Sequence, residues 1–349
     1  MPRRRSQQED YNLEHELLKA DTLIIAHSSE RPVDEQSSKD IKKTAKLTRR
    51  ICIRCKAIET GDVSYKACAK CQSAIYCSRE CQKLDWSSHK EHCADSRRHK
   101  RLEKQVSILI ANTNLLGVLK LAIILQLGLL DSPFPAEPFH VLVPLVVEPE
   151  CIREFAKLRG DLRTVRAPRP KAGNGKPRGM MQISGILPWH SRSLSRDQVL
   201  DLARSAVESG ASDITMDRLQ DVTVGVVIFS IGELDNRGGS TLEVPLLISA
   251  NMMRIAKMAE PFQYLIAANG EFWTMPMNAH SCIEFINNRI RIDHENKFLL
   301  RAEMTEADEQ LVRESAEEFG EDSDSNRRLA SELVKLRMSK EYVYSPLPI

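Results

Sequence analysis

The chain has 349 residues, of which 42% are apolar, so it can hold a small module plus one or two folded domains with a real core. Its formal net charge is only +2, so bulk charge predicts no class of partner. Local charge is uneven, with three basic runs and one acid-rich segment: Arg3–Arg5, Lys42–Arg50, Arg97–Lys104 and Glu303–Asp324. Basic runs occur in nuclear import signals and nucleic-acid contacts, and more often on solvated faces.

Residues 1–50 contain no glycine and are rich in Arg, Gln, Glu, Ser and Lys. Such a composition cannot bury enough apolar surface to fold alone, so we expect this N-terminal segment to be disordered. A short helix over Tyr11–Ala20 is the one element that its pattern favours, because Leu13 and Leu17 would share a face.

Seven cysteines and one histidine stand in four spaced pairs between Cys52 and Cys93. The pairs read Cys52-x2-Cys55, Cys68-x2-Cys71, Cys77-x3-Cys81 and His89-x3-Cys93. Two intervening residues let one tight turn aim both sulfurs at one metal, and three place the ligands at i and i+4 on one helix face. Eight such ligands meet the demand of two tetrahedral zinc ions, whether the pairs close sequentially or interleave.

A disulfide framework is the alternative for such a cluster. The first 50 residues lack the apolar run of a secretory signal, however, and paired cysteines with a spaced histidine favour metal. Because protein ligands fill every position, zinc is expected to fold the module rather than to catalyse a reaction. Cys151 and Cys282 stand alone and are expected to be buried thiols.

The stretch Tyr76–Cys93 resembles a MYND-type zinc finger, through a tyrosine before a cysteine, a Cys-Gln-x-x-Asp-Trp segment and a His-Lys-x-x-Cys ending. The resemblance covers residues 52–93, within an expected finger domain of residues 51–94. Ligands cross-brace in that family, which implies two interleaved sets. One set would be Cys52, Cys55, Cys77 and Cys81, and the other Cys68, Cys71, His89 and Cys93.

The resemblance also implies a shallow groove on the finger that docks a proline-containing peptide through Gln82 and Trp86. Tryptophan offers a flat apolar face to proline rings, and glutamine can hydrogen-bond an extended backbone. Packing of Trp86 within the finger's own core is the competing interpretation. Some peptide-binding members carry a serine where this chain has Ala69, which would remove one hydrogen bond. The chain's own end, Tyr344–Ile349, resembles ligands of the family in containing prolines, a leucine and an isoleucine.

A long helix is predicted from about Arg97 to Leu130, and its second half is apolar enough to suggest a membrane segment. Asn112, Asn114 and Lys120 lie inside the apolar window and argue against a span. We therefore expect a buried core helix and no membrane association.

Strand-like runs follow, and the pattern also indicates two further helices. The strands are expected over Phe139–Glu148, Met181–Leu187, Val222–Ile231 and Thr241–Ser249, with a weaker one over Arg289–Ile292. The helices are expected over Arg196–Glu208 and Ala250–Ala259. Adjacent strands joined by a turn favour an antiparallel sheet, so we expect an α+β domain of unknown function over residues 95–304 and a charged helical tail over residues 305–349.

MYND fingers also occur in SET-type lysine methyltransferases, which need a Gly-x-Gly loop before the finger. The first glycine here is Gly61, inside the finger. The segment Asn278–Cys282 resembles that family's Asn-His-Ser-Cys motif, but Ala279 breaks the spacing, so we expect a polar turn there. The sequence therefore predicts no catalytic residues and no enzyme.

Together these patterns predict an intracellular zinc-binding adaptor whose finger binds a protein partner, with transcriptional regulation as the expected setting. The alternatives are a degenerate or split methyltransferase and a nucleic-acid-binding regulator that uses the basic runs.

Overall fold

The computed structural model describes residues 36–45, 52–55, 57, 59, 64–71, 74–93, 97–131, 137–150, 154, 158, 177–189, 196–208, 222–231, 240–265 and 272–314. The finger contains β1 (Lys66–Ala67), β2 (Ile75–Tyr76) and α3 (Arg79–His92). The other helices are α2 (Ser38–Ala45), α4 (Arg97–Ala111), α5 (Thr113–Leu127), α7 (Arg196–Glu208), α8 (Ala250–Met258), α9 (Ala279–Ile292) and α10 (Glu306–Glu314). The other strands are β3 (Phe139–Pro149), β4 (Arg178–Ile183), β5 (Leu187–Pro188), β6 (Val222–Ile231), β7 (Ser240–Ser249), β8 (Phe262–Leu265), β9 (Phe272–Met275) and β10 (Arg301–Glu303).

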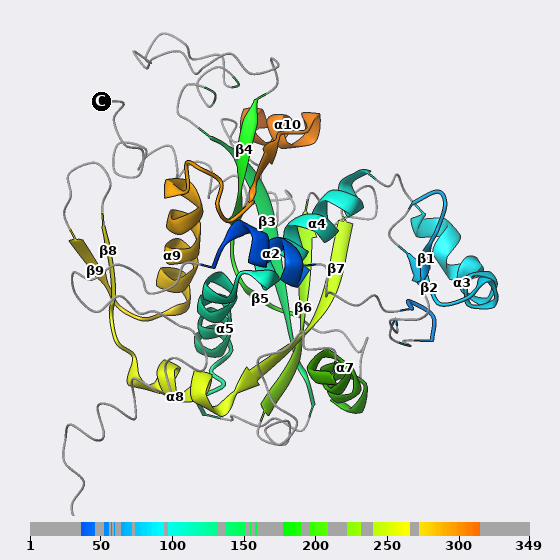
Figure 1. The fold of residues 1–349 in the computed structure, drawn as a ribbon, viewed down its shortest axis with the longest axis horizontal. Coiled ribbons are helices and arrows are strands. Elements are labelled where there is room, and N and C mark those ends of the chain that lie inside the picture. Colours follow the sequence, from blue (N-terminus) through cyan, green and yellow to red (C-terminus); the bar gives the residue numbers. More distant parts are fainter. Residues whose placement is uncertain are drawn as a thin grey trace, which may run out of the picture.

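A six-stranded sheet organises the larger part of the described chain (Figure 1). Its strands lie in the order β10-β4-β3-β6-β7, and β5 pairs with β3. The central strands β3 and β6 run parallel, whereas the other described pairings in this sheet are antiparallel. Helices and a mostly antiparallel sheet confirm the α+β class that the sequence predicts.

The central strands β3 and β6 are buried on both faces, which explains their almost continuous apolar sequence. Successive side chains of a strand point to opposite sides, so alternate residues enter different clusters. The odd-numbered apolar residues of both strands pack in the larger cluster with α2, α4, α5, α8 and α9. On the other face, Leu142 of β3 and Val224 of β6 cluster with Val199 of α7.

The prediction of one long helix over Arg97–Leu130 is wrong in one respect. The segment forms two helices, α4 and α5, which meet at a bend of 92°. Asn112 stands at the break, and its side chain caps α5 by accepting a hydrogen bond from the backbone N–H of Leu115 at 3.1 Å. Asparagine favours such caps over helix interiors, which explains the break. No single described helix is long and apolar enough to span a membrane, although the bent α4–α5 pair passes that test jointly.

Helix α2 corrects the expectation that residues 1–50 are disordered, because residues 38–45 form a helix packed on the domain. The side chain of Ile41 is fully buried against the larger cluster. The Gln36 amide spans the α4–α5 break, donating to the carbonyl of Ala111 at 3.0 Å and accepting from the N–H of Thr113 at 3.2 Å. Ile41 and Gln36 can hold this short helix in place because the rest of the domain provides their apolar and hydrogen-bonding partners. The helix predicted over Tyr11–Ala20 lies outside the described residues.

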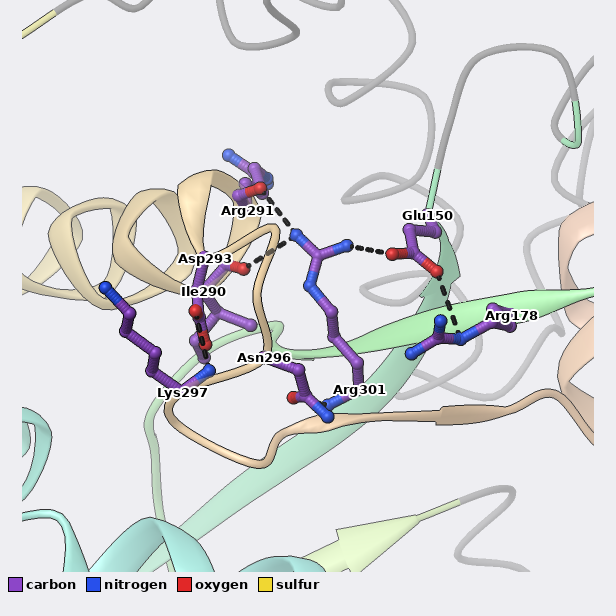
Figure 2. A network of polar contacts seen from close by, with 8 residues as sticks. All are labelled: Glu150, Arg178, Ile290, Arg291, Asp293, Asn296, Lys297 and Arg301. Carbon is purple, nitrogen blue, oxygen red and sulfur yellow. Dashed lines mark hydrogen bonds and ion pairs between the residues drawn. The ribbon is translucent and has the colours of Figure 1, made fainter. Parts of the chain in front are cut away.

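The C-terminal end of α9 is tied to the sheet by Arg301 of β10 (Figure 2). Its guanidinium donates to the carbonyl oxygens of Ile290 and Arg291 at 3.3 and 2.8 Å, where helix carbonyls lack intrahelical partners. The same guanidinium pairs with Glu150 at 2.6 Å, and Arg178 approaches that carboxylate at 3.4 Å. A cation at a helix C-terminus opposes the helix dipole favourably, so this network stabilises the fold.

Helix α10 lies in the segment expected to be a charged helical tail, and its residues pack on the domain. Val312 is fully buried in the larger cluster. Thr305 and Asp308 form a capping pair at its start, with the Thr305 N–H donating to the Asp308 carboxylate at 2.7 Å. Arg101 of α4 forms an ion pair with the same carboxylate. The core therefore continues past residue 304.

Several predicted boundaries agree closely with the structure. The bounds of β6 and α7 are those predicted, and β3 and β7 each extend the predicted strand by one residue. The expected strand over Met181–Leu187 is divided between β4 and β5. The strand predicted over Arg289–Ile292 is wrong, since these residues form the last turn of α9. The alternation of Arg and Ile in that turn resembles a strand, but the helical spacing of Ile283, Ile286 and Ile290 decides the outcome.

Candidate metal centre and binding surface of the finger

Short-range hydrogen bonds position the ligand pairs of the finger. Ser78 caps α3 by accepting a hydrogen bond from the N–H of Cys81 at 3.2 Å, so the helix begins at Arg79. Each cysteine knuckle is closed by a backbone hydrogen bond, from Cys52 N–H to Ala57 O and from Cys68 N–H to Ala74 O, both at 2.8 Å. The knuckles and the helix thus hold each pair of ligands at its spacing in the folded finger.

The structure brings the four pairs together in two groups, and the pairs interleave. The first group contains Cys52, Cys55, Cys77 and Cys81, and the second contains Cys68, Cys71, His89 and Cys93. The potential ligand atoms within each group all lie within 4.8 Å of one another. The first and third pairs therefore meet, as do the second and fourth, which is the arrangement that the family resemblance implies.

Ligand spacing fits tetrahedral zinc. A Zn–S bond of about 2.3 Å places two sulfurs roughly 3.8 Å apart at the corners of a tetrahedron. The sulfurs of Cys55 and Cys77 are 3.5 Å apart, and those of Cys68 and Cys93 are 3.8 Å apart. Cys71 Sγ lies 3.4 Å from His89 Nε2, which matches the shorter edge expected for one nitrogen ligand.

These separations exclude disulfides among the finger cysteines, because an S–S bond is about 2.05 Å long. The finger's seven cysteines are all free thiols. Cys282 is also free and is fully buried in α9, as the sequence predicts, whereas Cys151 lies outside the described residues.

Crowding of the thiols opposes the ionisation of Cys77 and Cys93, whereas at Cys52 burial is outweighed by backbone hydrogen bonds, which lower its pKa to about 6. Burial raises the pKa of Cys77 to about 12, and hydrogen bonds with the thiols of Cys81 and Cys55 make a smaller contribution in the same direction. Burial, followed by a hydrogen bond with Cys68, raises the pKa of Cys93 to about 11. A dication favours the thiolate form of every cysteine ligand and releases protons on binding, so metal affinity falls as the pH falls.

Aromatic side chains surround the imidazole of His89. The Tyr76 ring meets it edge-on with ring centres 6.2 Å apart, and the Trp86 ring is tilted over it at 5.9 Å. The Tyr76 hydroxyl donates to Asp85 at 2.7 Å, which joins β2 to α3. Burial, and then this carboxylate, raise the pKa of Tyr76 above its usual range. The ligand spacing does not predict this contact, although Asp85 belongs to the Cys-Gln-x-x-Asp-Trp segment that carries the resemblance.

The side chains predicted to bind a peptide lie on one face of α3, because Gln82 and Trp86 are one turn apart. Gln82 is half-buried and Trp86 is 46% exposed. Trp86 therefore both packs on His89 and presents part of its ring to solvent, which combines the two interpretations of this residue. Ala69 is exposed in the second knuckle. Leu84 is 67% exposed and points elsewhere around the same helix.

The segment Asn278–Cys282 begins α9 rather than forming a separate turn. The Asn278 side chain caps the helix by accepting from the N–H of Ser281 at 2.8 Å, and His280 is exposed. Asn278 is thus engaged in a structural cap, which accounts for its presence without a binding role.

Comparison with known families covers both parts of the chain. The MYND finger family matches residues 51–93, so the finger is a zinc-binding protein-interaction module. With the two ligand groups, this match supports two zinc ions per chain. No solved structure matches the chain. A family described as a domain of unknown function, DUF8205, matches residues 98–344. Because that match spans more than half of the sequence, the chain belongs to the DUF8205 family and carries a MYND finger ahead of the DUF8205 domain.

Proposed function

We propose that this protein is an adaptor whose finger binds a proline-containing segment of a partner protein on the face formed by Gln82 and Trp86. The observation that carries the proposal is that Trp86 packs on His89 while part of its ring remains exposed. The ring centres of Trp86 and His89 are 5.9 Å apart, yet the Trp86 side chain remains 46% exposed. A tryptophan fixed on one side and open on the other loses little conformational freedom when a proline ring stacks on it.

Gln82 complements this aromatic face. It lies one helical turn from Trp86, and its amide carries both donors and an acceptor for an extended backbone. A proline-containing segment is already extended before binding, which lowers the ordering cost. Resemblance to the finger family supports a transcriptional setting for the partner, and the free thiols support an intracellular location where cysteines stay reduced.

Zinc has a structural role in this proposal, with the two interleaved groups as its ligands. Four protein ligands close each site, so neither leaves a position for water or substrate. Metal binding therefore folds the finger and fixes Trp86 through His89, and it performs no catalysis. We accordingly propose a binding protein rather than an enzyme.

Metal analysis of the purified chain tests the ligand assignment. We expect two zinc ions per chain, and a lower content in Cys55→Ser and in Cys68→Ser, because each removes a ligand from a different group. The exposed Ser87→Ala variant on α3 is the control and should retain both ions. One ion in the wild-type chain would contradict the assignment.

Peptide titration tests the binding face. A fluorescein-labelled peptide with the sequence of Tyr344–Ile349 is titrated with the full chain, and fluorescence anisotropy reports binding. Trp86→Ala should weaken binding by roughly 30-fold, corresponding to about 2 kcal/mol for a buried aromatic anchor. The control is Leu84→Ala, which removes a more exposed apolar side chain from another side of the same helix. Equal losses in both variants, or none in either, would refute the proposed face.

A further inference from the structure

Two helices that carry exposed lysines, one on each side of the finger in the sequence, come together in the fold. Helix α2 packs beside α4, although the finger separates them along the chain (Figure 1). Both helices turn lysines away from the core. Five exposed lysines result, which we call the lysine platform: Lys39, Lys42, Lys43, Lys100 and Lys104.

Helical geometry directs these side chains outward. On α2 the lysines surround the side opposite to the fully buried Ile41. On α4, Lys100 and Lys104 lie one turn apart on the side opposite to the fully buried Leu102. Each helix thus offers its charged side to solvent while its apolar side packs in the core.

Within the described residues, no lysine of the platform forms a hydrogen bond or an ion pair, unlike the neighbouring Arg101, which pairs with Asp308. Acidic neighbours on the two helices are few. Asp40 already accepts a hydrogen bond from Ser37, and Glu103 is only partly exposed. Like charges four residues apart repel one another on a helix, as in the pair Lys100 and Lys104. An anion bound to the lysines would reduce this repulsion between their charges.

The platform lacks the exposed apolar side chains that would anchor an anionic membrane or an acidic protein. The exposed large apolar side chains among the described residues are Ile53, Leu84, Trp86, Leu130, Trp189 and Met258, and none belongs to α2 or α4. A helix that binds a membrane surface inserts apolar residues, and a protein partner is usually held by aromatic or aliphatic anchors. A phosphate backbone needs positive charge alone.

We infer that the lysine platform of α2 and α4 is a binding site for the phosphate backbone of nucleic acid. Lysine ammonium groups act as point charges on phosphates and read no base edges, so binding is independent of sequence. The site is separate from Gln82 and Trp86, and it adds a second binding activity to the proposed one. Because the chain enters the finger from α2 and leaves it into α4, a partner bound to the finger would be held near the nucleic acid.

Anisotropy titration of a labelled duplex DNA of about 20 base pairs and arbitrary sequence tests this inference, with the full zinc-loaded chain. We expect a dissociation constant in the range of roughly 10⁻⁶ to 10⁻⁴ M at physiological salt. If all five lysines contact phosphates, the plot of log affinity against log salt has a slope of about −4.5. Affinity then falls roughly 500-fold between about 50 and 200 mM salt.

Charge-matched variants locate the site. Replacing the five platform lysines by Gln keeps helix propensity similar and should abolish measurable binding at physiological salt. The control replaces five exposed lysines elsewhere by Gln, namely Lys66, Lys70, Lys83, Lys90 and Lys257, and should bind almost as the wild type does. Circular dichroism melting verifies that both variants fold. Equal losses in both variants would overturn the inference.

Other ligands provide the remaining outcomes. No binding of the wild-type chain to duplex DNA or duplex RNA at low salt overturns the inference. Platform-dependent binding to phosphatidylserine vesicles or to labelled polyglutamate, without binding to either duplex, also overturns it. The Trp86→Ala variant should bind the duplex as the wild type does, so the outcome of this test does not depend on the proposed peptide site.

Discussion

Truncating Ile41 to Ala should destabilise the DUF8205 domain, although Ile41 lies before the finger and outside the region that the family match covers. Its side chain is fully buried in the larger apolar cluster. Removing such an isoleucine costs about 2–5 kcal/mol, which combines the lost transfer free energy with the cavity left behind. For a domain of this size we expect the melting temperature to fall by roughly 5–15 °C.

The effect is measured by thermal melting followed by circular dichroism, with zinc content determined in the same samples. Zinc should remain at the wild-type level, because Ile41 is not part of the finger cluster. The exposed neighbour Lys42 supplies the control, since Lys42→Ala removes no core contact. Gln36→Ala should lower stability by about 1–3 kcal/mol, because it leaves backbone groups at the α4–α5 break without their partner. Unchanged melting of Ile41→Ala would show that α2 is not part of the domain core.

Three further predictions concern other parts of the fold. Gly225→Ala should cost about 1–3 kcal/mol, because an added Cβ would lie 2.3 Å from the Phe139 ring, and Phe139→Leu should restore part of the loss in a melting experiment. Tyr76→Phe should weaken zinc retention in a chelator competition, since it removes the 2.7 Å hydrogen bond to Asp85, worth about 1.5–3 kcal/mol to a charged acceptor; retention equal to the wild type would contradict this. Burial raises the pKa of Cys282 from 9.0 to about 12, so its contribution to stability is complete below pH 9 and is lost as the pH rises through 12. Mass spectrometry after iodoacetamide treatment should find Cys282 modified only when the domain is unfolded, and rapid modification of the native chain would refute its burial.

Local spacing in the sequence determined the ligand-bearing parts of the finger. Two residues between knuckle cysteines and three between the ligands at each end of α3 are short-range constraints, so the spacing alone lets each pair reach one metal. The same holds for β6, a short apolar run rich in β-branched residues, and for α7, whose apolar residues recur at helical spacing. Residues alone left open which pairs share a metal, and only the resemblance to the MYND family implied the interleaved sets that the fold assembles.

Tertiary structure decided the features whose partners lie far away in the chain. Asn112 inside an apolar run reads as an unfavourable helix residue, but it becomes a cap once α5 turns away from α4. Ile41 stabilises the domain only because the larger apolar cluster surrounds it, and Gln36 only because the break between α4 and α5 offers it a backbone carbonyl and a backbone N–H. The lysine platform likewise exists only after α2 and α4 pack together. Each of these features rests on long-range contacts, whose energy depends on positions in space that a local pattern does not contain.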